Sequence, residues 1–122
     1  MLNQEQTRIA PAMKIYIAGP MKGWPDWNYP AFHAAAARLR AAGASVVNPA
    51  ELGAKYGSPA EIEADPQKMD ALVLEELQAL GTCEAIYLLP SWQWSRGVRK
   101  ELQLALSRGL SIIVAPIEGG AR

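Results

Sequence analysis

The stretch AIYLLPSWQWSRGVRKELQLALSRGLSIIVAP, residues 85–116, contains the two kinds of segment that decide the fold. Its apolar ends, residues 85–89 and 111–115, are each followed by a proline and indicate buried strands. Between them, residues 98–108 place apolar side chains at helical spacing, on a stripe formed by Val98, Leu102, Ala105, Leu106 and Gly109. A strand, a helix and a strand of these lengths predict a parallel pair with a right-handed crossover.

The same alternation continues toward the N-terminus. Residues 14–18 and 45–47 are typical of strands, and residues 31–42 and 67–80 are typical of helices. We expect the stretch from Asn48–Pro49 to about Pro66 to be irregular, with one short helical turn. The pattern predicts an α/β, flavodoxin-like three-layer sandwich with a parallel sheet of four, or five, strands in the order 2-1-3-4. Such sheets bind ligands at the carboxyl ends of their strands, beside the point where strand order reverses.

Length, charge and cysteine content limit the class of protein. The 122 residues suffice for one domain, which we place at 13–122 after a flexible arm, residues 1–12. Twelve basic side chains balance twelve acidic ones, so neither a nucleic-acid polymer nor a membrane surface is an expected partner. With one cysteine, Cys83, and one histidine, His33, we expect no disulfide and no metal site. No organic cofactor is implied either. No apolar run approaches about 20 residues and no secretion signal precedes the domain, so a cytoplasmic location is expected.

Two glutamates lie on the inward faces of predicted helices. Glu101 sits on the shoulder of the apolar stripe of 98–108, and Glu76 faces the sheet from 67–80. Burying an ionised carboxylate costs several kcal/mol unless charges or hydrogen bonds compensate it. Either residue alone could bond a loop amide, pair with an arginine or, for Glu101, follow from the helix dipole. Together they favour a shared polar pocket and a catalytic pair.

The buried first strand carries a further candidate. Tyr16 lies on the strand face opposite Ile15 and Ile17, and a buried hydroxyl needs a partner, for which a carboxylate is an obvious choice. The alternative is a core tyrosine whose tip reaches water.

Aromatic and small polar residues gather in the predicted loops at the carboxyl edge of the sheet. All four tryptophans lie there, namely Trp24, Trp27, Trp92 and Trp94. Flat rings at this edge suit stacking on a nucleobase and equally suit a subunit interface. Ser95 and Gly97 precede a helix, where a hydroxyl and free amides can hold a phosphate, although serine is also a common N-cap.

Three motifs together resemble the nucleoside 2-deoxyribosyltransferase superfamily. They are YIAGP (16–20), the acidic helix before the third strand, and the spacing Ser95-x-Gly-x-x-x-Glu101 with its following Leu-x-x-Ala-Leu-x-x-Gly109. The last spacing is most similar to that of the 2′-deoxynucleoside 5′-monophosphate N-hydrolases. The pattern AGPMKGWPDWNYPAF (18–32) with YLLPSW (87–92) resembles a small phage and bacterial branch, the DUF4406-like proteins.

The resemblance implies roles for individual residues. Glu101 would attack the anomeric carbon of a (deoxy)ribosyl group, Tyr16 would hold that carboxylate, and Glu76 would assist the leaving base in place of the family's aspartate. The expected substrate-binding residues are Gly19, Pro20, Asp26, Asn28, Trp92, Ser95 and Gly97. A homodimer or larger homo-oligomer is implied as well.

Three departures from the family pattern shape the expected activity. Glu76 is one methylene longer than aspartate, and Lys22-Gly23-Trp24 replaces an arginine-containing phosphate loop. The sequence ends at Arg122, without the C-terminal region with which transferases complete a neighbouring subunit's site, which favours hydrolysis over transfer. We expect an N-glycosidase acting on a nucleoside 5′-monophosphate or a nucleoside. The alternatives are a deoxyribosyltransferase, a nucleotide-binding module without catalysis, and a phage accessory protein whose tryptophan loops bind a host protein.

Overall fold

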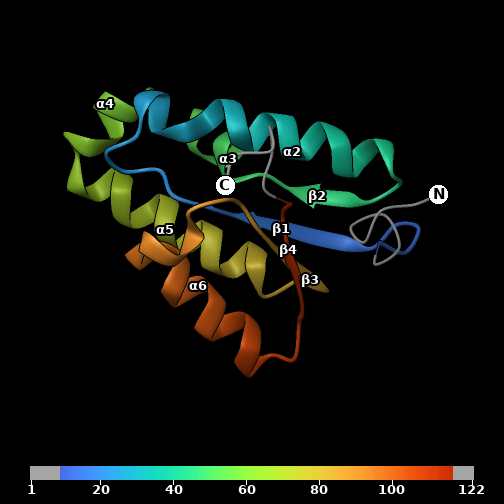
Figure 1. Cartoon of the computed structure of the whole chain (residues 1–122). Helices are drawn as coiled ribbons and strands as arrows, with labels where there is room; N and C mark the ends of the chain where they lie inside the picture. The colour runs from blue at the N-terminus through green and yellow to red at the C-terminus, as the bar shows by residue number, and fades with distance from the viewer. Residues whose placement is uncertain (1–8, 117–122) are drawn as a thin grey trace.

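A computed structural model describes residues 9–116 and has the expected α/β architecture (Figure 1). Four strands, all parallel, form one sheet in the order β2-β1-β3-β4. The strands are β1 (Lys14–Ala18), β2 (Ser45–Val47), β3 (Ala85–Leu88) and β4 (Ser111–Val114). Helices cover both faces of this sheet, which is consistent with the flavodoxin-like sandwich predicted from the sequence.

The helices divide between the two faces. They are η1 (Pro25–Asn28), α2 (Tyr29–Ala41), α3 (Pro49–Ala54), α4 (Pro59–Glu63), α5 (Pro66–Leu80), η2 (Trp92–Trp94) and α6 (Arg96–Ser107). Figure 1 shows α2 and α3 on one side of the sheet and α5 and α6 on the other. After β1 the chain forms β2 on one side of β1, and it then crosses to form β3 on the other side. Strand order therefore reverses between β1 and β3.

Alternation along β1 divides the core into two clusters. Ile15 and Ile17 pack with the buried face of α2, including Phe32 and Leu39. Tyr16 points to the opposite face and packs with residues of β3, α5 and α6. Because side chains alternate between the two faces of the sheet, the Tyr16 hydroxyl lies on the face that α5 and α6 cover.

The connection between β2 and α5 is more regular than expected. In place of one helical turn, it contains the short helices α3 and α4. Each begins with a side-chain N-cap followed by proline: Asn48 accepts from the Ala50 amide, and Ser58 forms a capping box with Glu61. An N-cap followed by proline at the first helical position starts a helix without any long apolar period.

Helix α6 is rotated relative to the stripe expected from its sequence. Val98 and Ala105 are buried, but Leu106 is 60% exposed and Gly109 is exposed as well. The prediction was wrong for these two positions because α6 packs against α5, β3 and η2, and no helix among residues 9–116 covers its other side. The buried face is consequently turned toward Glu101.

The expected N-terminal arm divides into two parts. Residues 1–8 lie outside the described residues, whereas Ile9 is buried in the cluster beneath α2 and the Ala12 amide donates to the Gly43 carbonyl at 2.9 Å. Across 9–116 no helix is both long enough and apolar enough to cross a membrane.

Candidate active site

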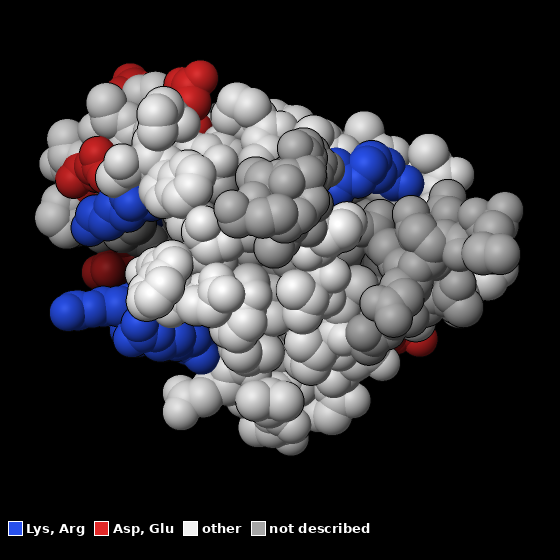
Figure 2. All heavy atoms as spheres, viewed as in Figure 1, with Lys and Arg blue, Asp and Glu red and all other residues white. Residues whose placement is uncertain are grey.

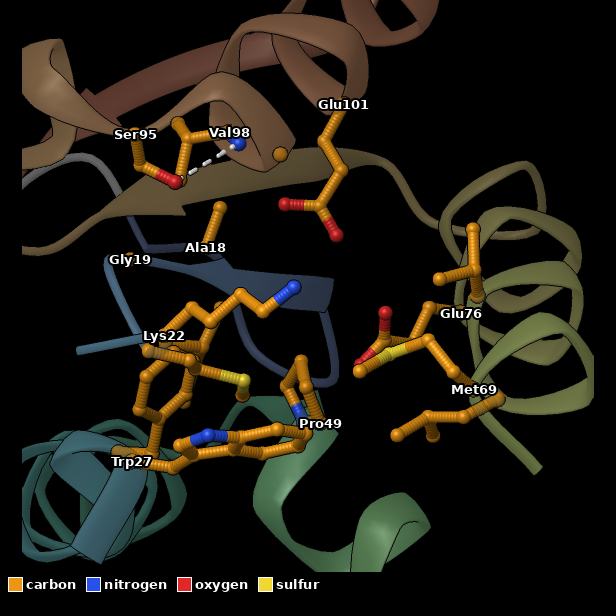
Figure 3. Close-up of a pocket in the computed structure, with 16 residues that line it drawn as sticks. Ala18, Gly19, Lys22, Trp27, Pro49, Met69, Glu76, Ser95, Val98 and Glu101 are labelled. Atoms are coloured by element: carbon orange, nitrogen blue, oxygen red, sulfur yellow. Dashed lines mark hydrogen bonds between the residues drawn. The ribbon is translucent and has the colours of Figure 1, made fainter. Parts of the chain in front are cut away.

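A cavity of about 210 Å³ opens at the carboxyl end of β1, next to the point where strand order reverses. Its walls come from the end of β1 and the following loop, from Phe32 and Pro49, and from one face each of α5 and α6. Figure 3 shows Glu101 pointing into this space from α6 and Glu76 pointing into it from α5. The topology therefore brings together two acids that are 25 positions apart in the sequence.

Glu101 is held by the tyrosine of the first strand. It lies in the second turn of α6, partly buried, and its Oε2 accepts a hydrogen bond of 2.6 Å from the Tyr16 hydroxyl. Burial raises the pKa of Glu101 to about 7, and the bond from Tyr16 acts in the opposite direction. Tyr16 itself is fully buried, and its pKa lies well above the ordinary value because of burial and the nearby charge of Glu101. Tyr16 is thus a hydrogen-bond donor that keeps its proton.

No residue among 9–116 donates such a bond to Glu76, which is less acidic. Burial raises its pKa to about 8, with further contributions from the charges of Glu101 and then Glu75. The hydrogen bond from Tyr16 favours ionisation of Glu101, and a charge on Glu101 then disfavours ionisation of Glu76, so we expect Glu101 to lose its proton first. Two carboxyl groups with separated acidities facing one cavity can supply a nucleophile or base and a proton donor.

Polar groups for an anion lie beside Glu101. Ser95 caps α6, its Oγ accepting from the Val98 amide at 3.2 Å, and both Ser95 and Gly97 line the cavity. The N-cap alternative for Ser95 is thus realised, and its position does not depend on a ligand. Figure 3 shows the Lys22 side chain extending into the space below Glu101. A helix N-terminus and a lysine at one cavity wall form a surface that is favourable for a phosphate or carboxylate group.

A second hollow adjoins the cavity and shares Lys22, Ser95 and Gly97 with it. Arg96 and the exposed rings of Trp24 and Trp94 also line this second hollow. Figure 2 shows both basic and acidic side chains at this end of the molecule, where α4 and the first turns of α5 and α6 lie. The rim around the acidic pair carries two basic residues, Lys22 and Arg96, and is partly aromatic.

Trp27 reaches the cavity because of an unusual backbone. Asp26, Trp27 and Asn28 have φ values of 54°, 52° and 61°, a left-handed conformation that costs non-glycine residues on the order of 1–3 kcal/mol each. The Asn28 side chain donates to the Pro20 carbonyl at 3.0 Å, and the Trp27 indole donates to Glu63 at 3.1 Å. The indole is 6% exposed and forms one wall of the cavity, as Figure 3 shows.

The structure brings together some of the expected site residues and not others. Glu101, Glu76, Gly19, Ser95 and Gly97 line the cavity, with Tyr16 behind Glu101. The remaining expected residues lie elsewhere: Pro20 lines the second hollow, Asp26 is exposed, Asn28 bonds the Pro20 carbonyl, and Trp92 packs on the core cluster beneath α5 and α6. Asp26, Asn28 and Trp92 line neither hollow, because the turns at η1 and η2 direct their side chains outward or onto the body.

Sequence reasoning left several lining residues unassigned. The sequence places Lys22 in the loop that replaces the family's arginine-containing phosphate loop and Trp27 among the four loop tryptophans suited to stacking, but neither is an assigned site residue. Met69, Leu72 and Val73 belong to the helix expected at 67–80, and they line the cavity as well. The last three share their helix face with Glu76, so the signal was present: apolar neighbours of an inward acid line the same pocket as that acid.

The described residues contain no group of three or more histidine, cysteine, aspartate or glutamate side chains placed to hold a metal ion.

No curated protein matches the sequence. One protein family does match, over residues 13–114, and this match includes every strand and every helix that lines the cavity. The chain therefore belongs to the family described as a domain of unknown function, DUF4406.

Proposed function

We propose that the protein is an N-glycosidase that cleaves the bond between base and pentose in a nucleoside 5′-monophosphate or a nucleoside. The observation that carries this proposal is the pair of carboxyl groups facing one small cavity, of which one accepts a hydrogen bond from a buried tyrosine and is the more acidic. Glycosyl bonds are commonly cleaved by two carboxyl groups in different protonation states.

In the first step, the Glu101 carboxylate attacks the anomeric carbon. A glycosyl ester forms as the bond from that carbon to the base nitrogen breaks, and the leaving nitrogen takes the electron pair together with the proton of Glu76. The Tyr16 bond to Oε2 fixes the orientation of the nucleophile. The acidity order of the pair supports this assignment, because Glu101 ionises while Glu76 keeps its proton.

In the second step, water attacks the same carbon. Glu76, now a carboxylate, accepts a proton from the water, the ester bond to Glu101 breaks, and free pentose leaves with its 5′ group unchanged. Glu101 and Glu76 return to their starting protonation states, so each residue completes a cycle. If a second base takes the place of water, the same intermediate gives transfer.

The surroundings support a nucleotide as the substrate. Ser95, the Gly97 amide and Lys22 offer donors and positive charge for a 5′-phosphate beside Glu101. Trp27, Met69 and Leu72 offer an apolar wall on which a base can stack. The homodimer implied by the family resemblance remains part of the proposal, and the exposed rings of Trp24 and Trp94 are candidates for its interface.

Base release from a panel of nucleosides and their 5′-monophosphates tests the proposal. We expect the unmodified protein to release free base from at least one compound, and Glu76→Gln to lower the rate by about 10²–10⁴-fold through loss of the proton donor. Glu101→Gln should abolish release. Glu75→Gln is the matched control, because Glu75 is the preceding residue of α5 but bonds Lys55 and Tyr56 away from the cavity. It should retain base release, with the pKa of Glu76 lowered slightly by loss of the Glu75 charge.

The same assay separates the alternatives. If adding a second free base yields a new nucleoside or nucleotide that contains this base, the protein is a transferase. Nucleotide binding without any release identifies a binding module and contradicts the enzymatic proposal.

A further inference from the structure

Tyr29, the first residue of α2, carries a buried hydroxyl with no hydrogen-bond partner among the described residues. Buried hydroxyl groups are nearly always bonded, since burial without a partner forfeits the bonds they would make to water. Phenylalanine would fill the same space without this penalty. The hydroxyl is consequently a feature to explain rather than a packing necessity.

The neighbouring helix leaves room for this oxygen. Gly53 lies inside α3, and a Cβ there would collide with the Tyr29 oxygen. Glycine within a helix is unfavourable relative to alanine. Two unfavourable features, a glycine inside a helix and a hydroxyl without a partner among the described residues, thus place the Tyr29 oxygen between α3 and α5.

The same oxygen lies near the proposed proton donor. The Tyr29 ring packs in the cluster of Trp27, Ile62 and Leu72, and Leu72 precedes Glu76 by one turn on the inward face of α5. The pKa of Tyr29 is raised by burial and next by the charge of Glu76, and no other titratable group within residues 9–116 shifts it. The hydroxyl therefore lies within electrostatic reach of that carboxyl group.

We propose that Tyr29 is a positioning residue for Glu76: once Glu76 has given its proton to the leaving base, its carboxylate turns and accepts a hydrogen bond from the Tyr29 hydroxyl. In this arrangement each acid has its own tyrosine, Tyr16 for Glu101 and Tyr29 for Glu76. The Tyr29 hydroxyl has no partner among the described residues, and an ionised Glu76 carboxylate is a stronger acceptor for it than a neutral carboxyl group. This inference rests on the proposed function for its place in the cycle.

Other groups act on Glu76 as well and set the baseline for the test. Glu101 faces it from α6, Glu75 is its neighbour on α5, Tyr16 interacts with it from β1, and Lys22 lines the same cavity from the loop after β1. None of these changes when the Tyr29 oxygen is removed, so a change in the titration of Glu76 reports on that oxygen.

The test is a pH titration of Glu76 followed by NMR in protein labelled with ¹³C at the glutamate side-chain carboxyl carbon, with Glu76→Gln identifying the signal. We expect Tyr29→Phe to move the Glu76 midpoint to a pH higher by roughly 0.5 to 1, because a donor to the charged form has been lost. Tyr56→Phe is the matched control: its hydroxyl bonds Glu75 at 2.7 Å, outside the cavity. That variant should leave the Glu76 midpoint in place.

Gly53→Ala provides a second variant that retains the tyrosine. Its new methyl group pushes the hydroxyl away from its site, and we expect the Glu76 midpoint to rise here too. Equal Glu76 midpoints in unmodified protein, Tyr29→Phe and Gly53→Ala would overturn the inference. The titration needs no substrate, so its outcome is independent of base release: a raised midpoint without release removes the proposed function alone, and release with an unchanged midpoint removes the role of Tyr29 alone.

Discussion

At the scale of single residues, two glutamates of identical chemistry acquire different acidities from their neighbours. Glu101 is more deeply buried but receives a hydrogen bond from Tyr16, whereas Glu76 receives none from the described part of the chain and its pKa is raised by the charge of Glu101. A bond of 2.6 Å to a charged acceptor is of the strong, charge-assisted kind. Tyr16 is thus the residue that decides which acid ionises first.

Tyr16→Phe tests this role. Losing the donor raises the pKa of Glu101 above about 7, so the acidic limb of the pH–rate profile moves to higher pH. Activity at pH 6 should fall, roughly tenfold if the limb moves from about pH 7 to about pH 8. Tyr87→Phe is the control, since Tyr87 is also buried in the sheet but its hydroxyl accepts from Arg38 on the α2 side. An unchanged acidic limb in Tyr16→Phe would contradict the assignment.

The pH dependence of the unmodified protein follows from the same two groups. Base release needs Glu101 ionised and Glu76 protonated, so the rate should rise through about pH 7 and fall through about pH 8. In Glu76→Gln the alkaline limb should disappear along with most of the rate. A rate that still increases steadily to pH 9 in the unmodified protein argues against Glu76 as the proton donor.

Sequence reasoning reached both acids but not their surroundings. Helical spacing and strand alternation locate Glu76, Glu101 and Tyr16, because these periods are local properties of the chain. The position of Trp27 depends on three consecutive left-handed residues, Asp26 to Asn28, that no short-range pattern favours. Which tryptophan enters the cavity was therefore not predictable from spacing, and Trp27 lines it where Trp92 was expected.

At the scale of elements, α6 shows how tertiary contacts choose among apolar residues. Leu102, Leu104 and Leu106 are equally hydrophobic, yet the first two are partly buried and Leu106 is exposed. Which leucines are buried depends on the side of α6 that contacts α5 and β3, and the sequence of α6 alone does not determine that side. The helix starts at Asn48–Pro49, Ser58–Pro59 and Asp65–Pro66, in contrast, are local signals that could have identified α3 and α4.

The orientation of α6 predicts an asymmetric pair of stability changes. Val98→Ala should lower the free energy of unfolding by roughly 1–3 kcal/mol, because Val98 is fully buried and losing its methyl groups leaves a cavity in the core. Leu106→Ala should change it by about 0.5 kcal/mol or less, as for other surface substitutions. Urea unfolding of both variants measures the difference, and a larger loss at Leu106 would show that the helix is rotated the other way.

At the scale of the whole molecule, the order β2-β1-β3-β4 places the end of β1 at the switch point, and both acids line the cavity at that place. Alternating strands and helices predict this topology well, since crossover handedness and strand order are general properties of such sheets. The shape of the cavity depends on how side chains of different layers pack together, so it could not be predicted from the sequence.

The acidic pair should also leave a signature in global stability. Both pKa values are raised above that of an unfolded glutamate, so the contribution of the pair is present below about pH 4.5 and is lost as the pH rises through about 7 and about 8. Glu51, Glu61 and Glu75, whose pKa values are lowered, act in the opposite sense and at lower pH. The free energy of unfolding should therefore decrease between pH 5 and pH 8.

Glu76→Gln should remove part of this decrease. At pH 8.5 we expect the variant to be more stable than the unmodified protein by roughly 1–3 kcal/mol, and at pH 5 to differ little, as judged by urea unfolding at both values. Glu75→Gln should not gain stability at pH 8.5, because that carboxylate is paired with Lys55. Equal stability of Glu76→Gln and unmodified protein at pH 8.5 would show that burial of this acid carries no cost.

The most direct test of the central claim is the mass of the protein quenched during turnover of a nucleoside 5′-monophosphate. The two-step chemistry predicts a peptide containing Glu101 that is heavier by one glycosyl group, and no such peptide in Glu101→Gln. Base release by unmodified protein with no glycosyl group on that peptide, or undiminished release by Glu101→Gln, would contradict the account.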